Sequence, residues 1–295
     1  SNQKYEIINH KHSDHKDIIK EQNNLVIMQL YNGDYILSSS SPWHYRLFWF
    51  LITTPLIVVI LFFIGLLLMI FRVGKRLFLI DQGRENDLWK SNNEMLDFYC
   101  LTIFLLSFFI TILFNKSQFG GWRHLYYVYP AVIFISIYAV YRILFIYKKN
   151  NIKTLISLLI FLNYSYVVYW SIKYHPFQNV YFNIIAKKYS TNNFDLDYWG
   201  LSHKLSLEQI IKNNKNYPIK VGTVSFSNLE TAHLMLSETD KNKIIIVHDL
   251  TEADFLITNF MRRINNNFVI DQDKYLKFHE ILIDGRSINT VYKKI

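Results

Sequence analysis

A cation, an imidazole and several aromatic rings stand together where a polar loop meets a long apolar run. The stretch 120–130 reads GGWRHLYYVYP. Arg123 keeps its proton and presents a planar fork of donors that matches phosphate oxygens. Trp122 and the tyrosines are amphipathic rings of the kind found at headgroup depth in a membrane. The stretch therefore predicts a phosphate-ligand site at the mouth of an apolar helix, with His124 beside Arg123.

The same residues fit a second interpretation. An aromatic belt at a membrane surface often includes a basic side chain that extends to the lipid phosphates. In that case Arg123 is a lipid anchor. The spacing of the residues fits both interpretations.

The composition indicates a membrane protein with a polar remainder. Hydrophobic residues make up 51% and aromatic residues 17% of the 295 positions, and several apolar runs are longer than soluble helices need. The net charge of +9 is spread over the polar segments. This pattern favours anionic lipid headgroups or phosphorylated substrates as partners and argues against nucleic acid. Cys100, the one cysteine, excludes a disulfide within the chain.

Four apolar runs are long enough to cross a membrane as helices. They cover residues 47–71, 98–114, 125–147 and 155–172. We therefore expect an α-helical membrane protein of about four transmembrane helices over residues 47–174, with a loop at 1–46 and a polar domain at 175–295.

Lysine and arginine near the ends of the runs predict the orientation. The loops 72–97 and 148–153 are the more basic pair, so both should lie in the cytoplasm. The loop 1–46, the loop around Gly120 and the polar domain would then share the extracytoplasmic side, where they could build one site.

The polar domain reads as a small α/β sheet domain. We expect helices at 202–213 and from Ser227 to about Leu236, the second opened by a capping box ending at Glu230. Strands are predicted at 219–226, 243–248 and 254–260. A hairpin of 275–283 and 286–292 should turn at Asp284-Gly285.

The N-terminal 41 residues are polar, without a signal segment, and we interpret the chain as a fragment. Apolar residues at positions 18, 19, 25 and 26 predict an interfacial helix. His10, His12 and His15 lie in a polar lead-in that reads as a solvated loop, so no metal site is predicted.

The segments 175–183 and 194–202 alternate aromatic residues with amides and carboxylates. Such residues commonly contact sugars through ring faces and polar groups. A linker whose rings pack on the domain is the favoured interpretation.

Five short motifs occur in an order that resembles one family. They are PWHY at 42–45, LITTP at 51–55, GWRH at 121–124 followed by Tyr129-Pro130, HP at 175–176 with YFN at 181–183, and DYWGLS at 197–202. From about residue 16 onward the chain is similar to the C-terminal half of bacterial glycosyltransferases of the GT-C fold. Dolichyl-phosphate-mannose-protein mannosyltransferases and the aminoarabinose transferase belong to this group.

The resemblance implies an integral enzyme of the bacterial inner membrane. Its donor would be a polyprenyl-phosphate-linked sugar and its acceptor an extracytoplasmic protein, lipid or glycan, with no further cofactor implied. Arg123 and His124 would hold the donor phosphate. The family's acidic base would precede Ser1, so the catalytic carboxylate is expected outside this chain, and Asp195 and Asp197 receive no such role.

A sugar cleft is expected beside the phosphate site. Trp43, His44 and Tyr45 open the first apolar run as Trp122 opens the third, so both loops can line one cleft if they face the same side. His44 would bond to the sugar and Trp43 would stack on it.

The alternative is a non-catalytic membrane protein. Its outer α/β domain would bind a partner or polymer, and Arg123 would only anchor lipid headgroups.

Overall fold

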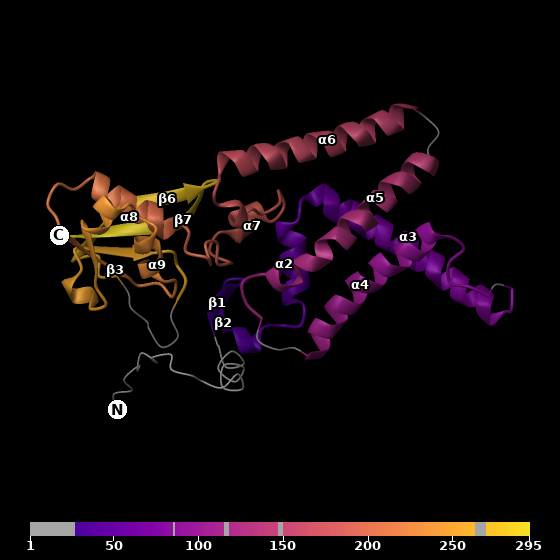
Figure 1. Cartoon of the computed structure of the whole chain (residues 1–295), viewed down its shortest axis with the longest axis horizontal. Helices are drawn as coiled ribbons and strands as arrows, with labels where there is room; N and C mark the ends of the chain where they lie inside the picture. The colour runs from indigo at the N-terminus through magenta and orange to yellow at the C-terminus, as the bar shows by residue number, and fades with distance from the viewer. Residues whose placement is uncertain (1–26, 85, 115–117, 147–149, 263–269) are drawn as a thin grey trace.

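A computed structural model describes residues 27–84, 86–114, 118–146, 150–262 and 270–295. A group of long helices occupies one end of the molecule and a mixed sheet domain the other (Figure 1). The predicted interfacial helix and the three N-terminal histidines fall mainly at positions 1–26, which lie outside the described residues.

In the part of the chain that the structure describes, four helices are long and apolar enough to cross a membrane, as predicted. They are α3 (Leu56–Asp81), α4 (Asn92–Phe114), α5 (Tyr129–Ile146), which continues the short 3-10 helix η2 (Arg123–Val128), and α6 (Asn150–Lys173). Helices α3, α4 and α5 pack on one another around aromatic rings. The ring centres of Phe62 and Phe104, for example, are 4.6 Å apart. In α6 the one buried residue is Trp170.

The prediction of an uninterrupted first run over 47–71 is wrong. The helix α2 (Tyr45–Thr53) ends before Pro55, and Thr54 between them is extended, with ψ at 140°. Proline lacks a backbone donor and disfavours a helical residue before it, so the chain turns at this point. The long helix α3 begins only at Leu56 and extends to Asp81.

A small hairpin that the sequence analysis did not include precedes α2. The strands β1 (Met28–Tyr31) and β2 (Asp34–Leu37) are joined by Asn32 and Gly33, whose φ angles are 57° and 91°. Two positive φ angles are those of a tight type I′ turn. A 3-10 turn, η1 (Ser38–Ser40), leads from the hairpin toward α2.

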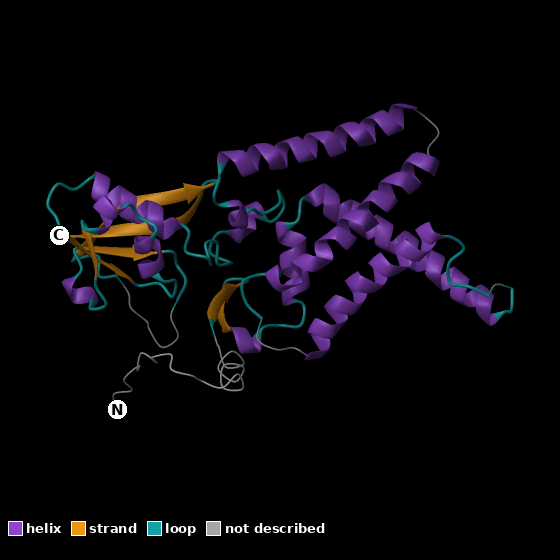
Figure 2. Ribbon diagram, viewed as in Figure 1, coloured by secondary structure: helices purple, strands orange, loops and turns teal. Residues whose placement is uncertain are grey.

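The C-terminal domain contains a five-stranded mixed sheet of order β4-β3-β5-β7-β6 (Figure 2). The strand β3 (Ile219–Thr223) pairs in parallel with its two neighbours, β4 (Ile244–Ile246) and β5 (Phe255–Thr258). The predicted hairpin is confirmed as β6 (Tyr275–Ile283) and β7 (Arg286–Lys294), with positive φ at Asp284 and Gly285. The strand predicted over 219–226 ends earlier than expected.

Short helices occur in this domain and in the segment that precedes it. They are α7 (Lys187–Ser190), α8 (Ser202–Lys212), α9 (Leu229–Leu234) and α10 (Glu238–Lys241), with 3-10 turns η3 (Gln178–Val180) and η4 (Leu250–Glu252). The expected capping box is wrong by one residue: Asn228 caps α9, accepting from the backbone N of Glu230 and Thr231. Ser227 bonds instead to His203, which holds α8 against this loop.

The segment from Tyr174 to Leu201 joins the two parts and packs against the helices. Asn183 donates its side-chain amide to the carbonyls of Leu51 and Thr54, at 2.7 and 3.0 Å. The buried Arg286 of β7 donates to Ser190 Oγ and to the Val180 carbonyl. These bonds hold the linker between the sheet domain and the end of α2, which is where the candidate site lies.

Candidate functional site

Two adjoining cavities lie where α2, η2 and the linker meet. The larger, here called the aromatic cavity, has a volume of about 400 Å³, and the smaller, the arginine cavity, about 140 Å³. Both are lined by Trp49, Gly120, Gly121 and Tyr198. The two cavities therefore share a wall.

The glycine pair gives the shared wall its shape. Gly120 and Gly121 have φ angles of +64° and +70°, which other residues rarely adopt. A Cβ atom on Gly120 would lie 2.9 Å from Nε of Arg123. The backbone N–H of Gly121 donates to the buried hydroxyl of Tyr45 at 3.1 Å, and that hydroxyl donates to Gln29 at 2.7 Å. The hydroxyl of Tyr45 therefore holds the glycine turn, and the lack of a Cβ atom on Gly120 leaves room for the side chain of Arg123.

Aromatic rings surround the guanidinium of Arg123 in the arginine cavity. Its Cζ atom lies 4.9 Å from the ring centre of Phe119, 5.8 Å from that of Tyr198 and 4.6 Å from that of Trp199. Its Nε donates to Nε2 of His124 at 3.4 Å. Among the described residues, Arg123 makes no ion pair with a carboxylate. An arginine held by ring faces keeps donors free for an anion.

A second arginine, which the sequence analysis did not single out, lies near this group. Arg46 stands at the start of α2, and the charges of Arg46 and Arg123 both act on the ring of His124. Burial lowers the pKa of Arg46, and its Nε has no hydrogen-bond partner among the described residues. The side chain of His124 is exposed and does not line the cavities.

The arginine cavity also contains a carboxyl group. Oδ2 of Asp195 accepts a hydrogen bond from the backbone N of Leu30 at 3.0 Å, while Oδ1 has no partner in the described part of the chain. Burial raises the pKa of Asp195 to about 7. A cation and a carboxyl group that exchanges its proton near neutral pH therefore line one cavity.

Asp197 has a structural role. Its two oxygens accept from the backbone N of Leu201 and Ser202, at 3.1 and 2.9 Å, where α8 begins. Burial raises its pKa to about 6. With both oxygens engaged in this way, the side chain holds the start of α8.

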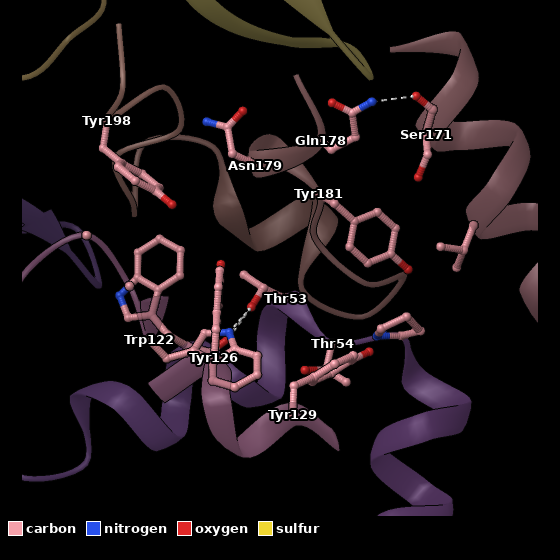
Figure 3. A pocket seen from close by; sticks show the side chains of 15 residues that line it. Thr53, Thr54, Trp122, Tyr126, Tyr129, Ser171, Gln178, Asn179, Tyr181 and Tyr198 are labelled. Carbon is pink, nitrogen blue, oxygen red and sulfur yellow. Dashed lines mark hydrogen bonds between the residues drawn. The ribbon is translucent and has the colours of Figure 1, made fainter. Parts of the chain in front are cut away.

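The aromatic cavity lies between the linker and the helix ends (Figure 3). In that view Asn179, Gln178 and Tyr198 lie on one side, and Trp122, Tyr126 and Tyr129 on the other. Two hydrogen bonds hold its walls: Nε1 of Trp122 donates to Oγ1 of Thr53 at 2.9 Å, and the Gln178 amide donates to the Ser171 carbonyl at 3.1 Å.

The predicted site residues are brought together only in part. Trp122 lines the aromatic cavity, and Tyr45 and Arg123 line the arginine cavity. Trp43 is 60% exposed and lies edge-on to His44, with 5.3 Å between the ring centres. Neither Trp43 nor His44 lines these two cavities. The hydroxyl of Tyr45 is already bonded inside the protein, so Tyr45 supports the glycine turn.

A buried serine–histidine pair in the sheet domain resembles catalytic machinery but fits a structural role. Nε2 of His203 lies 2.7 Å from Oγ of Ser227, and Nδ1 lies 3.1 Å from the Asn289 amide nitrogen. That amide donates, so Nδ1 accepts and the proton is on Nε2, directed at the serine oxygen. Burial lowers the pKa of His203 to about 4. The ring cannot take the serine proton in this arrangement.

Among the residues that the structure describes, no cluster of three or more His, Cys, Asp or Glu side chains could hold a metal ion. Comparisons with protein-family models, with curated proteins and with solved structures gave no match for this chain.

Proposed function

We propose that this chain acts in a membrane glycosyltransferase reaction of the GT-C type. In it, a sugar passes from a polyprenyl-phosphate donor to an acceptor on the extracytoplasmic side. The observation that carries the proposal is Arg123: a guanidinium without a carboxylate partner among the described residues, held by three rings beside the ends of long apolar helices. A lipid-linked phosphate at the membrane surface has the charge and the location that this group suits.

The reaction places negative charge where the arginine can act on it. As the bond between the anomeric carbon and the phosphate oxygen breaks, the electron pair remains on that oxygen and the phosphate becomes more negative. Two parallel N–H donors from one guanidinium stabilise this charge better than a single point charge does. The surrounding rings reduce contact with water and so strengthen the interaction.

The first prediction concerns phosphate binding by Arg123. We expect Arg123→Ala to weaken binding of a short-chain polyprenyl phosphate at least about tenfold, and Arg123→Lys to have an intermediate effect, because lysine keeps the charge but loses the paired donors. Binding of the matching polyprenol, which has no phosphate, should not change. Titrations of the purified chain in lipid nanodiscs measure both affinities.

Arg262 offers a matched control. It also stacks on an aromatic ring, 4.1 Å from the centre of Tyr35, but it is exposed and lines neither cavity. Arg262→Ala should bind the polyprenyl phosphate like the wild type. If Arg123→Ala also bound like the wild type, Arg123 would be a lipid anchor and the proposed function would lose its main support.

Steady-state transfer kinetics of Arg123→Ala in the full-length enzyme, which contains the catalytic carboxylate, separate the effect on donor binding from the effect on catalysis. If Arg123 also stabilises charge in the transition state, Arg123→Ala should lower turnover on the order of a hundredfold in addition to weakening donor binding. If it holds the ground-state phosphate equally well, donor affinity should fall and turnover should stay.

A further inference from the structure

The aromatic cavity has a mostly apolar lining with a few uncharged polar groups, and the proposed role of Arg123 leaves it without an occupant. Of the described residues that line it, none is Asp, Glu, Lys, Arg or His. Its volume of about 400 Å³ lies within the range of small-molecule sites, roughly 300–1,000 Å³. The ligand that fits such a lining is neutral.

Three side chains in this lining carry buried hydrogen-bonding atoms without partners among the described residues: Trp49 at Nε1, Asn179 and Thr54. Both Nδ2 and Oδ1 of Asn179 are buried and unbonded among the described residues, and so is Oγ1 of Thr54, a residue only 1% exposed. A buried polar atom left unpaired costs about 1–3 kcal/mol. These atoms are therefore expected to meet a ligand that both donates and accepts.

The neighbouring amides are different. Gln178 donates to the carbonyl of Ser171 and lies 2.9 Å from Nδ1 of His175. The amide of Asn183 is bonded to α2 and the residue after it. Asn179 is thus the linker amide whose bonding capacity stays open beside the cavity.

The opposite wall provides ring surfaces. Trp122 is buried and lies 4.9 Å from Tyr126 and 5.8 Å from Tyr129, centre to centre. Aromatic rings pack against the C–H groups of a sugar ring, while a hydroxyl group satisfies both the donor and the acceptor of an amide. The lining combines these two kinds of contact.

We infer that the aromatic cavity binds the sugar of the donor and that this sugar is neutral. Asn179 bonds to its hydroxyl groups, with Thr54 as a second partner. The inference rests on the proposed function, because the cavities share a wall and a phosphate at Arg123 stands next to a sugar in the aromatic cavity. A cationic amino sugar is disfavoured, since the described lining holds no carboxylate to pair with it.

The test compares three short-chain polyprenyl phosphates: one without a sugar, one carrying mannose and one carrying a cationic amino sugar. With the purified chain in nanodiscs, we expect mannose to strengthen binding about tenfold over the sugar-free phosphate. The amino sugar should add nothing. Asn179→Ala should remove the gain from mannose and leave the affinity for the sugar-free phosphate unchanged.

Matched variants keep this test independent of folding. Asn213→Ala removes an exposed amide that lines neither cavity, so the gain from mannose should persist. Because the Asn179 amide makes no hydrogen bond among the described residues, Asn179→Ala should melt within a few degrees of the wild type. Asn179→Asp adds a carboxylate and should shift preference from mannose toward the amino sugar.

The outcomes distinguish the inference from the proposed function. Loss of phosphate binding in Arg123→Ala, together with a mannose gain that survives Asn179→Ala, would overturn the sugar site and leave the phosphate site standing. A mannose gain of zero in the wild type would do the same. Binding that depends only on the length of the isoprenoid chain would overturn both the sugar site and the phosphate site. Unchanged phosphate binding in Arg123→Ala would instead remove the proposed function.

Discussion

The carboxyl group of Asp195 lies in the wall of the arginine cavity, bonded through one oxygen to the backbone of Leu30. Burial raises its pKa from 3.8 to about 7. The native state therefore binds a proton that the unfolded chain releases between these two values. Stability is highest while the group is protonated and falls as the pH rises from about 4 to about 7.

We predict that Asp195→Asn increases stability near pH 8 and has little effect near pH 4. The amide keeps an oxygen for Leu30 but cannot ionise. The difference in the free energy of unfolding between variant and wild type should therefore grow from pH 4 to pH 8 and reach about 3–4 kcal/mol. Melting temperatures of the two proteins in detergent, measured from pH 4 to pH 8, provide the check. Asp34→Asn, at an exposed position of the hairpin, is the control. A difference that stays constant over this pH range would show that Asp195 does not titrate there.

At the scale of elements, α3 and α5 approach one another at a glycine. A Cβ atom added to Gly65 would lie 2.1 Å from the backbone oxygen of Ile135, a contact that neither helix can relieve by moving a side chain. Small residues allow such close approach of helices in membranes. Pro55, which precedes the first residue of α3, lines the aromatic cavity.

Gly65→Ala should therefore push the two helices apart and cost about 1–3 kcal/mol, seen as a lower melting temperature in detergent. Gly74→Ala is the matched control in the same helix, because a Cβ there meets nothing within 4 Å. Alanine favours helices over glycine, so the control should be neutral or slightly stabilising. Equal effects of the two substitutions would mean that Gly65 is not a close-packed contact.

The elements were predictable where their pattern is local. The lengths of the apolar runs are enough to predict the four long helices of the described residues. The dipeptide Asp284-Gly285, which suits a tight turn, is enough to predict the long hairpin. The break at Pro55 also had a local signal, the proline itself, but it was overlooked because the apolar run continues on both sides. The hairpin at Asn32-Gly33 had the Asn-Gly signal of a tight turn, which was overlooked because the surrounding segment is polar. These were errors of interpretation.

The candidate site was predictable at Tyr45 and in the stretch 120–130, whereas Asp195 and Asn179 become members of it through tertiary contacts. Asp195 becomes a cavity residue through a bond to Leu30, 165 positions away in the chain. Asn179 and the neighbouring Gln178 both carry a side-chain amide, and the fold gives a hydrogen-bond partner to the amide of Gln178 and none, among the described residues, to that of Asn179. Residue type and spacing are identical for a paired and an unpaired amide, so no sequence pattern could have selected Asn179.

At the scale of the whole molecule, three segments far apart in the chain meet at one end of the helices. The Gln29 amide in the hairpin donates to the Gln118 carbonyl at 2.7 Å, and Asn183 of the linker bonds to the end of α2. The turn at Gln82 lies after the opposite end of α3. A membrane across the helices would therefore separate Gln82 from the hairpin and the sheet domain.

The last prediction concerns this separation and its direction. In a Cys100→Ala background, we expect Asp34→Cys in the hairpin and Glu238→Cys in the sheet domain to react with a membrane-impermeant maleimide on intact cells. Gln82→Cys should react only after the membrane is opened, because Lys75, Arg76 and Arg84 favour the cytoplasm. All three positions are exposed in the structure, so protein burial does not limit their labelling. Labelling of Gln82→Cys alone on intact cells would reverse the orientation but keep the shared site. Labelling that places Asp34→Cys and Glu238→Cys on opposite sides of the membrane would separate the hairpin from the linker. The arginine cavity needs both Leu30 and Asp195, so it could not form in that case.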